Sequence, residues 1–202
     1  MSFISLNFVV LFACTFILYH TLPSRFRKAT LLTASCLFIG FYHLAFLITA
    51  LILTLTTFYL GKWIGQAKRE SGMKGIYFSG VCFLVVSWLA FRYADRLTNC
   101  HILFPLGISF YTFQAISYLT EIYWQEEEPE KSLPDFMIYM LFFMKFLSGP
   151  IERASDMLPQ LKSCKATDYT SMVYGMRLIV VGLIKKLILA DSIAPCIDGV
   201  FG

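Results

Sequence analysis

Charged residues are scarce in this chain of 202 residues. Asp, Glu, Lys and Arg make up 15% of it and hydrophobic residues 57%, whereas soluble domains contain about 25% charged residues. A chain this short cannot bury so much apolar surface in a soluble fold, because the surface of a small domain is a large fraction of the whole. We therefore expect an integral membrane protein, with the lipid bilayer as its first partner.

The sequence also lacks the motifs of metal centres and of soluble enzymes. Its six cysteines are scattered without a CxxC pair, and no His cluster has metal-ligand spacing. It contains no Ser-His-Asp set, Walker-type loop, zincin motif or dinucleotide fingerprint. We assign no catalytic role to His20, His43 or His101, which lie near expected membrane edges. We predict no metal, no bound cofactor and no nucleic-acid partner.

Long uncharged runs indicate five membrane crossings. A helix needs roughly 20 residues to cross the hydrocarbon core. The uncharged stretch from residue 29 to residue 61 is far longer than that, and we divide it by a tight turn near His43. The expected crossings are residues 3–22, 29–42, 44–61, 76–91 and 103–124. Seven basic residues fall in the loops on one side and two in a loop on the other. The positive-inside rule then puts the N-terminus outside.

The segment at residues 136–150 is apolar but too short for an ordinary crossing, and Ser148-Gly149-Pro150 ends it. Apolar segments of about 10–14 residues are often re-entrant or interfacial. Non-helical backbone at membrane depth must be enclosed by protein or line a wet cavity. We therefore predict a re-entrant segment and, beside it, a cavity.

Two further segments have less defined roles. Residues 172–190 form either another crossing or a helix along the cytoplasmic face. The acidic loop at residues 125–130 is expected to be a solvated tether. The predicted fold is all-α: a polytopic transmembrane helix bundle with a re-entrant segment, and one membrane domain over residues 1–202.

Small polar side chains in FPLGISFYTFQAISYLTEIYW, residues 104–124, share one helix face. Ser109, Thr112, Ser117 and Thr120 form this stripe, and Gln114 lies at its edge. Such a stripe either packs against another helix or faces a wet cavity. Our candidate tunnel residues are Ser109, Thr112, Gln114 and Ser117.

A second polar segment, SGPIERASDMLPQL, follows the short apolar stretch and lies at the expected cytoplasmic side. Its candidate residues are Gly149, Pro150, Arg153 and Asp156. The planar guanidinium of Arg153 suits a phosphate or a carboxylate, or it pairs with Asp156 three residues on.

The two motifs together, FPLGISFYTFQAISYLTEIY and FMIYMLFFMKFLSGPIERASDMLPQL, closely resemble the membrane-bound O-acyltransferase family, in particular its alginate O-acetyltransferase branch. The N-terminal MSFISLNFVVLFACTFILYHTLP and the C-terminal GLIKKLILADSIAPCIDGVFG resemble that branch too. The resemblance implies transfer of an acyl group from a thioester donor, acetyl-CoA or an acylated carrier protein, to a hydroxyl of an extracytoplasmic polysaccharide. It also implies extracytoplasmic acetyltransferase partner proteins and a multi-pass location in the bacterial cytoplasmic (inner) membrane.

One departure from the family concerns its catalytic histidine, which lies in the second half of longer members. None of the three histidines here lies in the matching motif, so none receives that role. We expect an N-terminal portion that is inactive alone. The alternative is a non-catalytic membrane scaffold or a transporter subunit of a polysaccharide-modification system.

Overall fold

The structure is a computed structural model that describes residues 6–67, 69–98, 107–146, 152–163 and 168–190. Every regular element in these ranges is helical, which confirms the all-α prediction. The helices are α1 (Leu6–Thr21), α2 (Ser24–Tyr42), α3 (Leu44–Gln66), α4 (Glu70–Thr98), α5 (Ile108–Tyr123), α6 (Leu133–Leu141), α7 (Ala154–Ser163) and α8 (Tyr169–Ile184), with a π-helical stretch at Lys185–Ala190.

The chain divides into two compact units, Met1–Ser163 and Cys164–Gly202. Unit 1 contains α1 to α7. Unit 2 contains α8 and the π-helical stretch, and the large apolar side chains of α8 are exposed, as in Leu178 and Ile184. The candidate site described below lies in unit 1.

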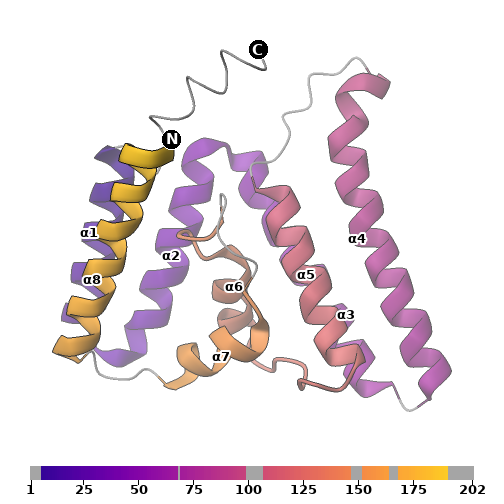
Figure 1. Cartoon of the computed structure of the whole chain (residues 1–202). Coiled ribbons are helices and arrows are strands. Elements are labelled where there is room, and N and C mark those ends of the chain that lie inside the picture. The colour runs from indigo at the N-terminus through magenta and orange to yellow at the C-terminus, as the bar shows by residue number, and fades with distance from the viewer. Residues whose placement is uncertain (1–5, 68, 99–106, 147–151, 164–167, 191–202) are drawn as a thin grey trace. The chain divides into compact units, whose positions relative to one another are not determined.

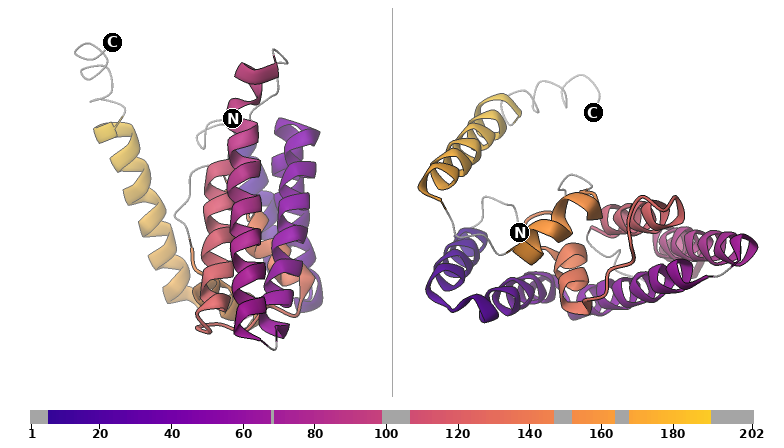
Figure 2. Two further views of the ribbon diagram at one scale, coloured as in Figure 1. Left: turned by 90° about the vertical axis from the view of Figure 1, so that its right-hand side faces the viewer. Right: turned by 90° about the horizontal axis from the view of Figure 1, so that it is seen from below.

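Unit 1 consists of two layers of helices. Helices α1, α2, α3 and α4 pack each against the next to form one layer, and α5 and α6 cover it, with α5 on α3 and α4 and with α6 on α2 and α3. Figure 2 shows both layers from below, and α7 packs against α6. We call the end with the α1–α2, α3–α4 and α5–α6 connections the lower end, as it lies at the bottom of Figure 1.

Within the described ranges, two helices are long and apolar enough to cross a membrane: Leu44–Gln66, with 23 residues, and Glu70–Tyr93, with 24. At roughly 1.5 Å per residue, each reaches past a hydrocarbon core of about 30 Å. Much of the apolar surface of α4 faces outward, since Phe78 is 64% and Val86 is 55% exposed. An exposed apolar surface of this size is rare in soluble monomers. It is typical of a membrane protein.

Three helices, α2, α3 and α4, extend beyond the uncharged runs from which they were predicted. α2 begins at Ser24 and so includes Arg25, Arg27 and Lys28, and α4 begins at Glu70. Lys and Arg are good helix formers, and their stems can keep the charge at the membrane edge while the helix continues. The break between α2 and α3 lies at the predicted position, where His43 Nδ1 accepts a hydrogen bond of 3.3 Å from the Ala45 N–H.

The core of unit 1 lies around α6. Phe136 and Tyr139 of α6 and Phe143 just beyond it are 0% exposed. The Phe143 N–H donates to the hydroxyl of Ser35 in α2 over 3.2 Å, so the backbone just past α6 is bonded to the first layer. Ion pairs fix the beginning of this segment, as described below.

Candidate functional site

The predicted polar stripe on α5 is divided between two neighbouring helices. Ser109 Oγ accepts a hydrogen bond of 3.0 Å from the indole N–H of Trp88 in α4. Thr120 is 3.1 Å from the hydroxyl of Tyr77, also in α4. Gln114 instead donates its amide N–H to the backbone oxygen of Tyr139 in α6, over 2.8 Å. The stripe therefore has hydrogen-bond partners on both α4 and α6.

Thr112 lies in the part of the stripe with fewer contacts. Its side chain is 4% exposed, and its hydroxyl has no hydrogen-bond partner within the described ranges. Together with Val85, Trp88, Phe113 and Ile116 it lines a cavity of about 100 Å³ between α4 and α5. The role of these residues as tunnel walls stays a prediction.

A buried lysine lies between α6 and α7. Lys145 is 8% exposed, and its ammonium is 3.4 Å from a carboxylate oxygen of Glu152 and 3.1 Å from the sulfur of Met157. It also lies 4.5 Å from the centre of the Tyr139 ring. The Tyr139 hydroxyl donates to the backbone oxygen of Glu152 over 3.0 Å. These contacts join the end of α6 to the segment that precedes α7.

The second predicted motif falls partly within the described ranges. Gly149 and Pro150 lie outside them, as does part of the predicted re-entrant segment. Arg153 and Asp156 are both exposed at the start of α7, and the Asp156 N–H donates to the Arg153 carbonyl over 3.2 Å. Within unit 1 as described, no ion pair joins the two side chains. The positive charge of the Arg153 side chain instead stabilises the ionised form of Glu121.

Glu121 is the residue that the sequence-based interpretation missed. It lies in the last turn of α5 and is 5% exposed. One carboxylate oxygen, Oε1, accepts a bond of 3.3 Å from the hydroxyl of Ser117, one turn earlier. The backbone N–H of Ser155, in the first turn of α7, also donates a hydrogen bond to this carboxylate. The spacing of Ser117 and Glu121 was a usable signal, but their burial was not visible in the sequence.

Two ion pairs anchor the lower end. Asp135, 3% exposed at the start of α6, lies 2.8 Å from the ammonium of Lys28 in α2. Glu130, 4% exposed, lies 2.6 Å from the ammonium of Lys162 in α7 and accepts bonds of 2.9 Å from the N–H groups of Lys131 and Ser132. The acidic loop is therefore not a free tether at Glu130, because that carboxylate is buried and bonded.

We call Gln114, Ser117, Glu121, Tyr139, Lys145, Glu152 and Arg153 the polar junction, which is the candidate functional site. It combines the carboxylates of Glu121 and Glu152 and the amide of Gln114 with the cations of Lys145 and Arg153, where α5, α6 and α7 meet. Among the described residues, no three His, Cys, Asp or Glu side chains form a group that could hold a metal.

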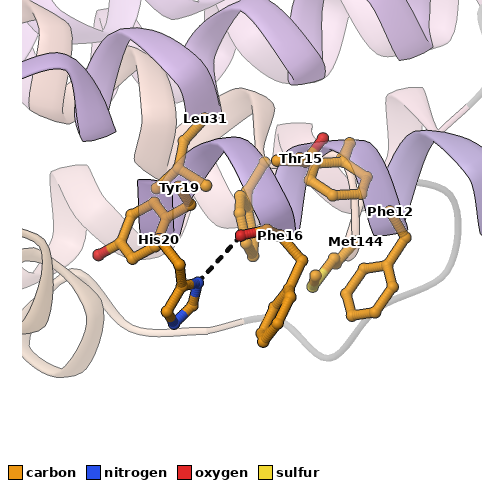
Figure 3. A pocket seen from close by; sticks show the side chains of 9 residues that line it. Phe12, Thr15, Phe16, Tyr19, His20, Leu31 and Met144 are labelled. Carbon is orange, nitrogen blue, oxygen red and sulfur yellow. Dashed lines mark hydrogen bonds between the residues drawn. The ribbon is translucent and has the colours of Figure 1, made fainter. Parts of the chain in front are cut away.

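A separate apolar pocket of about 280 Å³ lies between α1, α2 and the segment just after α6. Figure 3 shows Phe12, Phe16, Tyr19 and His20 on α1 lining it, with Met144 from that segment. The Nδ1 of His20 lies 2.9 Å from the carbonyl oxygen of Phe16 on the preceding turn. His101 lies outside the described ranges.

The sequence is similar over its whole length to proteins named probable alginate O-acetylase AlgI. It is 31% identical to the protein from Azotobacter vinelandii and 30% identical to the one from Pseudomonas aeruginosa, with all of this chain covered and 44% and 42% of the relatives. It is 26% identical to a peptidoglycan O-acetyltransferase from Helicobacter pylori, over 86% of this chain and 40% of the relative.

The chain thus spans less than half the length of these relatives. It matches no protein-family model and no solved structure. The resemblance inferred from its motifs is confirmed at the level of the alginate O-acetylases, to which the whole chain is similar.

Proposed function

We propose that the chain forms part of a membrane-bound O-acetyltransferase. This enzyme takes an acyl group from a cytoplasmic thioester donor, acetyl-CoA or an acyl-carrier thioester, and moves it toward a hydroxyl of an extracytoplasmic polysaccharide. The observation that carries the proposal is the similarity of the whole chain to proteins named alginate O-acetylase, with a peptidoglycan O-acetyltransferase as a further relative. The names of these relatives support an acyltransferase with a glycan acceptor.

The lower end of unit 1 would face the cytoplasm, with the N-terminus outside and the helices crossing the bacterial inner membrane several times. Seven of the described cations lie in or beside the connections at this end: Arg25, Arg27, Lys28, Lys62, Arg69, Lys74 and Lys131. Cytoplasmic loops carry such an excess of Lys and Arg.

The polar junction would form the wall on the donor side. Arg153 is exposed there, and a guanidinium binds phosphate in two-pronged geometry. The acyl group would then pass along Ser109, Thr112, Gln114 and Ser117, with the segment at residues 136–150 as a re-entrant wall. Extracytoplasmic acetyltransferase partner proteins would complete the transfer to the polysaccharide.

The full-length gene product in liposomes, supplied with its extracytoplasmic acetyltransferase partner proteins, radiolabelled acetyl-CoA and a polysaccharide acceptor, tests the proposal. Gln114→Ala and Arg153→Ala should each lower acyl transfer about tenfold, the loss expected for one hydrogen bond to a buried or charged group. Lys131→Ala, which removes a cation whose pair with Glu128 is 87% exposed on both sides, serves as the control.

Unchanged transfer in both variants would show that these residues do not line the path. Absence of transfer in the wild-type protein with either donor would favour the alternative, a non-catalytic scaffold or transporter subunit. Thermal unfolding of each variant separates a lost contact from a lost fold.

A further inference from the structure

The apolar pocket beside α1 has an elongated wall of aromatic rings. The rings of Phe12, Phe16 and His20 follow one another along α1 (Figure 3), with ring centres 6.3 Å and 4.4 Å apart. Phe12 and His20 are separated by two turns, which is roughly 12 Å along a helix. Thr15 also lines the pocket, but its hydroxyl already donates to the Leu11 carbonyl over 2.7 Å. The wall therefore suits a long apolar group rather than a polar one.

This pocket is open on its outer side. Phe16 is 38% exposed and Met144 is 40% exposed, although both line it. The helix α1 contains no Asp, Glu, Lys or Arg, so the pocket lies in the part of the chain that we place in the bilayer. A gap left empty there would lose the van der Waals contacts of its lining. The acyl chains of bilayer lipids are the apolar groups at hand to fill it.

A cation lies at the lower mouth of the pocket. Arg27, in the first turn of α2, has its guanidinium carbon 5.2 Å from the centre of the Tyr19 ring, which lines the pocket. Leu31, one turn further along α2, lines it as well. The Nε of Arg27 is buried and has no hydrogen-bond partner within the described ranges. The neighbouring Lys28, by contrast, pairs with Asp135. Arg27 therefore has a donor left for a ligand at the mouth.

The beginning of α2 adds to the positive field at this mouth. Its first turn contains Arg25 as well as Arg27 and no acidic residue, and no side chain caps it with a hydrogen bond. The N–H groups at the start of a helix favour an anion such as a phosphate. Basic pockets between membrane helices bind anionic lipid headgroups in the same way. An acyl-chain site and a phosphate site thus lie next to each other, as the two groups do in a phospholipid.

We propose that this pocket binds an anionic glycerophospholipid of the bilayer. One acyl chain lies along Phe12 and Phe16, and the phosphate contacts the Arg27 guanidinium at the lower end. Because Arg25 and Arg27 are both cationic, a headgroup with net negative charge, such as phosphatidylglycerol, binds more tightly than a zwitterionic one. This inference is independent of the proposed acyl transfer, since it concerns α1 and α2 rather than the polar junction.

The headgroup is tested with the full-length gene product in detergent. Native mass spectrometry measures the dissociation constants of dioleoylphosphatidylglycerol and dioleoylphosphatidylcholine. Arg27→Leu should weaken binding of phosphatidylglycerol about tenfold, as expected for a lost hydrogen bond to a charged group. Binding of phosphatidylcholine should change less, because its choline cation offsets the contact, so the preference for the anionic lipid falls. Arg69→Leu, the same change at the exposed connection between α3 and α4, is the control and should leave both constants unchanged.

A second variant tests the acyl chain. Phe12→Ala removes part of the aromatic wall and should weaken binding of both lipids about threefold, because dispersion contacts with the chain are lost whatever the headgroup. Phe78→Ala is the matched control, since Phe78 is 64% exposed on α4 and lies outside the pocket lining. Excess inorganic phosphate should not displace either lipid.

Equal affinity for phosphatidylglycerol in the wild type and in Arg27→Leu would overturn the inference. Displacement of the lipid by inorganic phosphate would also overturn it, because the site would then bind a free anion. Unchanged binding in Phe12→Ala would do so as well, since another part of the protein would then fill the pocket. The unfolding temperature of each variant in lipid-free detergent shows whether it is folded. Arg27→Lys, which keeps the charge but not the planar fork, should retain part of the preference.

Discussion

At the scale of single residues, the polar junction shows how the chain accommodates charge inside an apolar bundle. The side chain of Lys145 is 7% exposed and that of Glu152 is 38% exposed. A buried ion is stable only when its partners replace the water it has lost. Glu152, Met157 and the Tyr139 ring surround the Lys145 ammonium in place of water. Glu152 is partly exposed, so water can hydrogen-bond to its carboxylate if Lys145 is removed.

This asymmetry predicts unequal effects when either charge of the pair is removed. Glu152→Gln leaves the Lys145 ammonium buried without its anion and should lower the free energy of unfolding by about 3 kcal/mol. Lys145→Met leaves Glu152 in partial contact with water and should lower it by about 1 kcal/mol or less. Unfolding of the two variants by denaturant in detergent micelles checks the order.

Lys131→Met is the matched control, since both side chains of its pair with Glu128 are 87% exposed and surface pairs contribute about 0–1 kcal/mol. A larger loss in Lys145→Met than in Glu152→Gln would contradict the described burial of Lys145.

At the scale of the elements, close approach between α3 and α5 positions the acidic loop. A Cβ atom on Gly61 would lie 2.8 Å from a ring carbon of Tyr118 in α5. The hydroxyl of Tyr118 accepts a hydrogen bond of 3.0 Å from the N–H of Glu130. The absence of a side chain at Gly61 therefore lets Tyr118 take the position in which its hydroxyl binds the acidic loop at Glu130. The carboxylate of Glu130 in turn pairs with Lys162 of α7.

Gly61→Ala should push α3 and α5 apart and lower the free energy of unfolding by about 1–3 kcal/mol, the usual cost of overpacking. It should also make the acidic loop easier to cleave with a Glu-specific protease. Gly72→Ala in α4, where a Cβ meets nothing within 4 Å, should stabilise the protein by up to about 1 kcal/mol, because Ala is the better helix former.

Equal protease resistance in the wild type and in Gly61→Ala would contradict the role of this contact. An equal loss of unfolding free energy in Gly61→Ala and Gly72→Ala would also contradict the role of this contact.

At the scale of the whole molecule, the sequence predicts the helices better than their connections. The uncharged runs indicated α1 to α5 and the break at His43, because apolar composition and length decide what can lie in a bilayer. Their ends were predicted less well, since charged residues continue a helix beyond the apolar core. Arg25, Arg27 and Lys28 are examples.

The buried carboxylates were the least predictable feature of the candidate site. Asp135 pairs with Lys28, 107 residues away in the sequence, and Glu130 pairs with Lys162. No periodicity indicates contacts over such separations, so Glu130 reads as part of a solvated acidic run. The α5 stripe was visible in the sequence, but its division between α4 and α6 depends on how the helices pack.

The central claim is that an acyl group from a donor at the lower, cytoplasmic end reaches an acceptor on the other side. Acyl transfer from labelled acetyl-CoA or an acetylated carrier protein tests it most directly. It is measured in sealed inside-out and right-side-out vesicles that contain the full-length gene product, its extracytoplasmic partner proteins and a polysaccharide acceptor. With donor added outside, the account predicts labelled polysaccharide within inside-out vesicles and none with right-side-out vesicles. Label formed only with right-side-out vesicles, or in neither preparation, would contradict it.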